Sequence, residues 1–413
     1  FVSYYCSSKI NKRYRVINYV LTILLLITIS LLLIRYVSLS FIYVIGVFIC
    51  GTFYCIFVGN KKVRLLAINV GAVLVALGLF EMYLLAWIPF SEPRHQYEYF
   101  VKNEETKIGS LMQSGVTTNH KLLGYAATRS VRFFETKRLK EEIVYEASYT
   151  INDKGLRATS NQYNEAATPV LFFGGSFIFG EGVSDDETAA ATIEQQSEGA
   201  YRVHNFGFIG YGPHQMLAIL ENGLERPVLT DHIPAYAFYL TIGDHVRRIS
   251  GLAPWDHNGP KYKLKPHGNA TNVGPFDQHL IGKTIKLLNK SLIFQSRVTD
   301  HLSDSEDEVL FASIVAKSST LFEIRYGGKF FVIYWDDQKT EKETIRIAKL
   351  RKHGLRVIPI SNVLPHFSRN QKNYLIHKDL HPNALAHKLI GDFLLRLMRH
   401  ETPLTNGKDL ANK

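Results

Sequence analysis

The chain has 413 residues and a formal net charge of +11, a length that suits two or three folding units, one of them with a large core. Eight basic residues and no carboxylate precede Glu81, which leaves a net charge of only +3 for the rest of the chain. Because no basic stripe interleaved with aromatic residues accompanies the charge, the composition argues against a nucleic-acid partner. All three cysteines, Cys6, Cys50 and Cys55, precede residue 60, so no disulfide is expected in the remaining chain.

Three apolar runs open the chain and predict three transmembrane helices, at about 16–34, 39–58 and 65–90. Each run is close to the roughly 20 residues that cross a bilayer as a helix, and three in succession fit a cleaved signal peptide or a buried hairpin poorly. Four basic residues precede the first run and three lie between the second and third, whereas only Arg35 lies between the first and second. This distribution predicts a cytoplasmic N-terminus and places the chain after Phe90 on the other side. Glu81 lies within the third run, where it either has a function in the membrane or, as we favour, reaches the interface. Since the chain begins at Phe1 rather than Met, further residues can precede it.

Residues 91–165 are polar and mixed, and predict a linker and strap with one strand, Val144–Ile151, followed by a turn at Asn152–Arg157. From 166 to 400, apolar runs alternate with helical patterns. The predicted strands are Val170–Phe173, Arg202–Phe206, Ala235–Ile242, Phe330–Trp335 and Arg356–Ile360. The predicted helices are Thr188–Gln196, Pro213–Leu224, Asp304–Tyr326, Thr344–His353 and Asn383–His400. This order predicts an α/β domain whose parallel sheet has helices on both faces, before a tail at 401–413.

The insert at 251–278 is rich in Gly, Pro, His and Asn and is too long for an ordinary connection. Loops of that length are functional or disordered, so either a substrate-binding flap or a surface loop fits. In a flap, Trp255 and Tyr262 are candidates for stacking on a sugar.

Two segments carry catalytic residue types. Gly174-Gly175-Ser176 follows the first strand of the predicted sheet, where glycines allow a sharp turn that exposes the serine hydroxyl. Asp379-Leu380-His381 precedes the last helix, and a carboxylate two residues before a histidine can orient the ring as a base for a serine. Each segment alone also fits a structural turn.

Together with Asn205–Pro213, these segments resemble three of the four blocks of the SGNH (GDSL-like) hydrolase family, in its membrane-anchored bacterial type. Thr150–Arg157 is similar to a stretch before the serine in such proteins. The resemblance implies a flavodoxin-like sheet, with Ser176 as nucleophile, His381 as base and Asp379 as its partner. It also implies an oxyanion site made by the N–H groups of Ser176 and Gly210, with Tyr211 as a further substrate contact. Where the third block usually has asparagine, this chain has His245, so either His245 donates to the oxyanion or that donor is lost.

The resemblance implies a serine esterase that acts on O-acyl groups, in our interpretation O-acetyl groups of an envelope or extracellular glycan, with no metal or cofactor. The same triad suits an O-acyltransferase supplied by a partner membrane protein, and a silent glycan-binding scaffold is the alternative from another class. We expect a multi-pass protein of the bacterial cytoplasmic membrane, in contact with lipid and with its catalytic domain periplasmic or extracellular.

Overall fold

The computed structural model describes residues 46–47, 49–51, 54, 61–91, 95–101, 105–108, 116–139, 142–159, 166–229, 232–266, 268–289, 305–337 and 340–401. The chain divides into two compact units, one of Phe1–Pro93 with Thr284–Thr299 and one of the remaining residues. In the first unit, helix α3 (Lys61–Ser91) packs against helical residues near Cys50. A Cβ at Gly46 would lie 2.7 Å from Leu74 Cδ1, so this glycine permits a close helix contact.

Among the residues that the structure describes, no helix combines the length and the apolar character needed to cross a bilayer. The predicted span at 16–34 lies outside the described residues, 39–58 is described in part, and 65–90 falls within α3. The prediction of three spans therefore has no support from the described structure.

The second unit contains a parallel sheet with the strand order β13-β12-β9-β7-β8. Its strands are β7 (Thr168–Gly174), β8 (Tyr201–Asn205), β9 (Tyr236–Thr241), β12 (Lys329–Tyr334) and β13 (Arg356–Pro359). All five predicted strands are confirmed within two residues at each end, and the order is the flavodoxin-like one. In this order the chain direction across the sheet reverses between β7 and β9, and the crevice beyond their carboxyl ends is the expected ligand site.

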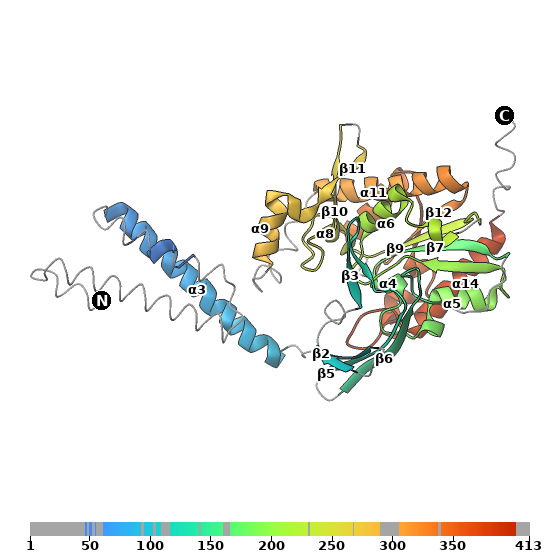
Figure 1. Cartoon of the computed structure of the whole chain (residues 1–413), viewed down its shortest axis with the longest axis horizontal. Helices are drawn as coiled ribbons and strands as arrows, with labels where there is room; N and C mark the ends of the chain where they lie inside the picture. The colour runs from blue at the N-terminus through green and yellow to red at the C-terminus, as the bar shows by residue number, and fades with distance from the viewer. Residues whose placement is uncertain are drawn as a thin grey trace, which may run out of the picture. The chain divides into compact units, whose positions relative to one another are not determined.

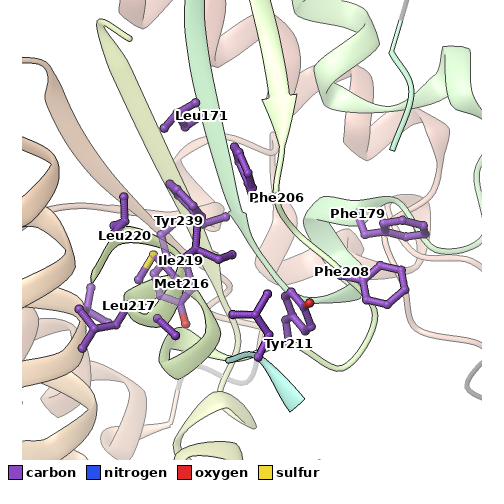
Figure 2. Packing of buried hydrophobic residues seen from close by; sticks show 14 of the residues in the cluster. Leu171, Phe179, Phe206, Phe208, Tyr211, Met216, Leu217, Ile219, Leu220 and Tyr239 are labelled. Carbon is purple, nitrogen blue, oxygen red and sulfur yellow. The ribbon is translucent and has the colours of Figure 1, made fainter. Parts of the chain in front are cut away.

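Helices cover both faces of this sheet (Figure 1). Successive side chains of β7 alternate between two cores, Leu171 facing one and Phe172 the other. The core with Leu171 includes residues of α6 (Pro213–Asn222), α11 (Ser305–Tyr326) and α12 (Glu341–Lys352), and Figure 2 shows Met216, Leu217 and Leu220 of α6 within it. The core with Phe172 includes residues of α5 (Ala189–Gln196) and α14 (Ala384–His400). The five predicted helices are thus confirmed. The shorter α-helices described in this unit are α4 (Ser176–Phe179), α7 (Arg226–Leu229), α8 (His245–Ile249) and α13 (Phe367–Asn370). Helix α9 (Leu280–Leu288) contains the boundary between the two units.

The described part of residues 91–165, predicted as a linker and strap with one strand, contains more strands than predicted. It forms an antiparallel sheet in the order β2-β1-β5-β6, from β1 (His95–Val101), β2 (Glu105–Ile108), β5 (Val131–Leu139) and β6 (Glu142–Ile151). A two-stranded hairpin joins β3 (Thr117–His120) to β4 (Gly124–Ala127). Only β6 corresponds to a predicted strand, because its alternating buried side chains give a clear sequence pattern.

The insert at 251–278 contains an antiparallel pair, β10 (Pro260–Leu264) and β11 (Ala270–Pro275), and is anchored to the helices. Asp256 Oδ2 lies 2.7 Å from His214 Nε2, and the Tyr262 hydroxyl donates to Glu221 Oε2 at 2.7 Å. Tyr262 is 2% exposed, so the prediction that it stacks on a sugar is wrong: its ring is part of the core and its hydroxyl fixes the hairpin to α6.

Candidate active site

Ser176 lies immediately beyond the carboxyl end of β7, as the first residue of α4. Gly174 has a φ of +145°, and the carbonyl oxygen of Leu240 would lie 2.6 Å from a Cβ at that position, so the turn accepts only glycine there. The Ser176 hydroxyl lies 2.8 Å from His381 Nε2. The fold therefore places in contact a serine and a histidine that lie 205 positions apart in the sequence.

A tight turn before α14 holds His381 and Asp379. Asp379 Oδ1 lies 2.5 Å from His381 Nδ1 and also accepts the His381 backbone N–H at 3.1 Å. The residues on either side of Asp379, Lys378 and Leu380, have positive φ values of 65° and 73°. Non-glycine residues rarely adopt this conformation, and it concentrates at functional sites. The backbone of this turn therefore orients both Asp379 and His381.

The second oxygen of Asp379 is bound by Lys137, a residue of β5 that the sequence gave no reason to single out. Both side chains are almost fully buried. Burial opposes ionisation of Asp379, but the hydrogen bond and charge of His381, together with Lys137, hold the pKa of Asp379 below its usual range. Asp379 is thus a carboxylate, able to stabilise a protonated His381.

A second acidic side chain also faces His381. Glu181 Oε2 lies 3.5 Å from His381 Nε2, the nitrogen that contacts Ser176. Burial lowers the pKa of His381, but the charge of Glu181, followed by the hydrogen bond and charge of Asp379, raises it above its usual value. Glu181 stands five residues after the serine in the glycine-rich turn, a position that carried no functional prediction.

Two segments that carry predicted oxyanion residues adjoin Gly175, the residue before Ser176: a Cβ at Gly175 would lie 3.0 Å from the carbonyl oxygen of Tyr211, the neighbour of Gly210, and 3.2 Å from His245 Nε2. Gly210 has a φ of +78°, and the Trp255 indole donates to its carbonyl at 3.2 Å, which fixes this peptide. His245 begins α8, directly after β9, and is 1% exposed. The His245 imidazole therefore packs against the residue that precedes Ser176. Ser176 thus follows β7 and His245 follows β9, the two strands between which the sheet order reverses.

The groups around His245 fix its ring. Its Nδ1 lies 2.7 Å from the Tyr239 hydroxyl and 3.2 Å from Thr241 Oγ1. Burial, followed by the charge of Arg248, lowers the pKa of His245 well below its usual value, so the ring is neutral. Asp244, which could oppose an oxyanion, is instead bound by Arg247 and Arg248 at 2.7 and 2.8 Å.

The two remaining predicted substrate contacts, Tyr211 and Trp255, differ in their exposure. Tyr211 is 5% exposed and its hydroxyl donates to the Tyr125 carbonyl at 2.7 Å, so its predicted role in binding substrate is wrong in this conformation; the residue packs the turn. Trp255 is 37% exposed and lies beside Gly210, next to the site, so its role stays a prediction.

The stretch Asn152–Arg157, singled out from the sequence, has a structural task. The Arg157 guanidinium donates to the carbonyls of Phe179, Gly180 and Val183 at 2.7, 2.5 and 2.6 Å. It also lies 4.6 Å from the centre of the Tyr149 ring. Arg157 therefore holds the glycine-rich turn that follows Ser176.

Sheet and site define an α/β protein with a Ser-His-Asp arrangement at the point where the strand order reverses. Within the described residues no cluster of His, Cys, Asp and Glu could hold a metal ion. No family profile and no curated protein matches the chain.

Among solved structures, the chain is similar to a lipolytic protein of the G-D-S-L family from Veillonella parvula, at 15% identity over 57% of this chain and 100% of that one, with a TM-score of 0.33. It is also similar to the psychrotrophic esterase EstA from Pseudoalteromonas sp., at 11% identity over 56% and 97%, with a TM-score of 0.33. A lipase from a goat rumen metagenome matches at 12% identity over 55% and 96%, with a TM-score of 0.30. Scores this low leave the geometry of the site as the basis for any function.

Proposed function

We propose that this protein is a serine ester hydrolase of the SGNH type, which forms an acyl intermediate on Ser176. The observation that carries the proposal is the continuous contact from the Ser176 hydroxyl through His381 to Asp379, at 2.8 and 2.5 Å. A serine hydroxyl is a poor nucleophile until a neighbouring base accepts its proton, and this contact supplies that base.

In the first half-reaction, Ser176 Oγ attacks the ester carbonyl while its proton moves to His381 Nε2. The new C–O bond places negative charge on the carbonyl oxygen, and Asp379 stabilises the imidazolium. His381 then gives its proton to the leaving alcohol as the ester C–O bond breaks. In the second half-reaction, His381 takes a proton from water, whose oxygen attacks the acyl carbon. The bond between that carbon and Ser176 Oγ then breaks, the acid leaves, and His381 returns the proton to Ser176 Oγ.

The oxyanion would be stabilised by the N–H groups of Ser176 and Gly210 and by Nε2–H of His245. These donors are fixed before charge develops, which is the condition for a large effect on the transition state. The support for His245 is its place beside Gly175 and its neutral ring.

For the substrate class we propose an O-acyl group, such as O-acetyl, on an envelope or extracellular glycan, with Trp255 as a sugar contact. This part rests on the sequence: three apolar runs and the distribution of basic residues favour a multi-pass protein of the bacterial cytoplasmic membrane, its N-terminus inside and its active site outside. An outside location can be tested with a reporter active only outside the cytoplasm, fused after residue 95. Activity only of a cytoplasmic reporter at that position would refute the orientation.

The test of the catalytic proposal is labelling of the full chain in detergent micelles by a fluorophosphonate probe, with p-nitrophenyl acetate turnover measured in parallel. Ser176→Ala and His381→Ala should each abolish labelling and lower turnover on the order of 10⁴-fold or more, where the background rate permits. Ser250→Ala, which changes a serine outside the site, should label like the wild type. A folded Ser176→Ala protein with wild-type turnover would refute the assignment of Ser176, whereas a folded wild type that neither labels nor turns over the ester would favour the glycan-binding scaffold.

Acyl transfer to a sugar hydroxyl uses the same residues, with the hydroxyl replacing water in the second half-reaction. Such an enzyme would require an acyl donor, for which a partner membrane protein is the proposed source. Product analysis with an added glycoside distinguishes the two: an acylated glycoside indicates transfer, and free acid alone indicates hydrolysis.

A further inference from the structure

The turn that follows the nucleophile places a buried carboxylate on the serine side of His381. Glu181 is 8% exposed, and its backbone N–H donates to the Ser176 carbonyl at 3.1 Å, so the turn folds back toward its own start. Its Oε2 is 3.5 Å from His381 Nε2. Asp379, by contrast, contacts the opposite nitrogen, Nδ1. The ring therefore lies between two carboxylates.

Several contacts hold Glu181 in this position. Gly180 and Gly182 on either side of it both have a φ of +87°, a conformation that favours glycine. Arg157 binds the Gly180 carbonyl, and the Gly182 N–H donates to the Tyr149 hydroxyl at 2.8 Å. A Cβ at Gly182 would lie 2.3 Å from Ile376 Cδ1, in the turn that leads to His381. The placement of Glu181 is thus built into the packing of three segments.

The surrounding charges differ for the two carboxylates. Lys137 is paired with Asp379, which offsets part of that negative charge. For Glu181, the ion pair that the structure shows is the one with His381. A third buried carboxyl, Glu135 of β5, receives a hydrogen bond from Tyr149 at 2.7 Å; burial, followed by the charge of Glu181, raises the pKa of Glu135. Glu135 therefore retains its proton more readily than an exposed glutamate.

We propose that Glu181 is a second acidic partner of His381, which stabilises the imidazolium from the nucleophile side while Lys137 offsets the charge of Asp379. This proposal rests on the proposed function, since it assigns His381 as the base. Glu181 acts through His381 and is a positioning residue for the proton at Nε2. When the proton leaves Ser176 it arrives 3.5 Å from a negative oxygen, so the charge separation in the first half-reaction is stabilised.

The contact between Glu181 and His381 should also reduce activity at low pH. His381 works as a base only when neutral, and activity is lost as the pH falls through its pKa. Besides Asp379 in its own turn, the ionisable groups that act on His381 are Glu181, Lys137 of β5 and His387 of α14. Glu135 of β5 interacts with Glu181, and Tyr145 of β6 interacts with Glu181 and Asp379. Since Glu181 raises the pKa of His381, removing its charge should move the acid limb to lower pH.

The experiment compares kcat/KM for p-nitrophenyl acetate across about pH 5 to 9 in the full-length wild type and in Glu181→Gln. Two changes should occur together: the plateau falls about tenfold because the base is weaker, and the acid limb moves to lower pH. Glu181→Asp, which keeps the charge, should restore part of both. Asp186→Asn, which removes an exposed charge from the next short helix, is the matched control and should follow the wild type.

An acid limb in Glu181→Gln that coincides with that of the wild type would overturn the proposal, even if the plateau fell, because a merely structural role changes the rate without moving the limb. If the Gln protein lost its native circular dichroism, Glu181→Ala, which also removes the charge and adds no atoms, would take its place with the same expected shift. Ser176→Ala is measured alongside. If it is inactive while the limb stays unmoved, only the role of Glu181 fails; if it is active, the proposed function fails as well.

Discussion

Replacing His245 tests whether this chain has substituted a histidine for the usual amide donor at the oxyanion. Nδ1 of His245 lies 2.7 Å from the Tyr239 hydroxyl, and burial raises the pKa of Tyr239, which therefore keeps its proton. We assign that proton to the bond with Nδ1, which leaves the imidazole proton on Nε2. Nε2 is the atom that packs against Gly175, next to the nucleophile.

The expected magnitude follows from the loss of one fixed donor. Removing a single oxyanion donor costs about 10²- to 10³-fold in kcat, or roughly 2.7–4 kcal/mol of transition-state stabilisation. His245→Ala should fall in this range with little change in KM, because the bond strengthens only as charge develops on the oxygen. His245→Asn restores an N–H donor and should recover much of the rate. Since the pKa of His245 lies well below its usual value, neither variant should move the acid limb.

Steady-state kinetics of the full chain with p-nitrophenyl acetate, over the neutral pH range, measure both effects. Tyr239→Phe supplies a third comparison, since it removes the proton that fixes the ring tautomer while keeping the aromatic packing. Equal, near wild-type rates for the Ala and Asn variants would refute the assignment and return His245 to a structural role. A large loss in Ala that Asn does not recover would mean that the imidazole shape, not its N–H, is what the site requires.

Three further changes test other parts of the site. In the double variant of Ser176→Ala and His381→Ala, turnover should match either single variant, because nucleophile and base act as one unit; a further large loss would contradict the shared step. Arg157→Met removes a buried guanidinium bound to three carbonyls and should lower the free energy of unfolding by about 3–5 kcal/mol, measured by chemical denaturation of the full chain, and a loss below 1 kcal/mol would show that the turn holds itself. Gly175→Ala places a methyl group 2.9 Å from Arg248 Nη1 and should reduce kcat/KM about 10- to 100-fold at an unchanged fold by circular dichroism, whereas wild-type kinetics would mean that the arginine yields.

The contact between Ser176 and His381 could be predicted from the sequence because the carboxyl ends of parallel strands lie at one edge of the sheet. The inner strands β7, β9 and β12 are apolar runs that are buried on both faces, and the residues after such strands meet at one edge. Ser176 follows β7, and the short spacing from Asp379 to His381 already shows that the two can touch. Local pattern and topology were enough for these residues.

Lys137 could not be predicted in this way. Its contact with Asp379 joins positions 242 residues apart, and it comes from an antiparallel strand whose side chains follow no catalytic spacing. Tyr262 failed for a related reason. An aromatic residue in a Gly- and Pro-rich insert is expected at the surface, but the insert folds into a hairpin and its ring joins the core. Both cases depend on tertiary packing that short sequence windows do not contain.

The pairing of Lys137 with Asp379 also changes where the proposed catalytic domain begins. By sequence pattern alone, a minimal catalytic fragment would begin near residue 166, where the first parallel strand starts. Such a fragment would leave Asp379 without its lysine and would remove Arg157 and Tyr149 from the turn that carries Glu181. The antiparallel sheet is therefore part of the candidate active site, and the smallest fragment expected to keep that site intact must include β5 and β6.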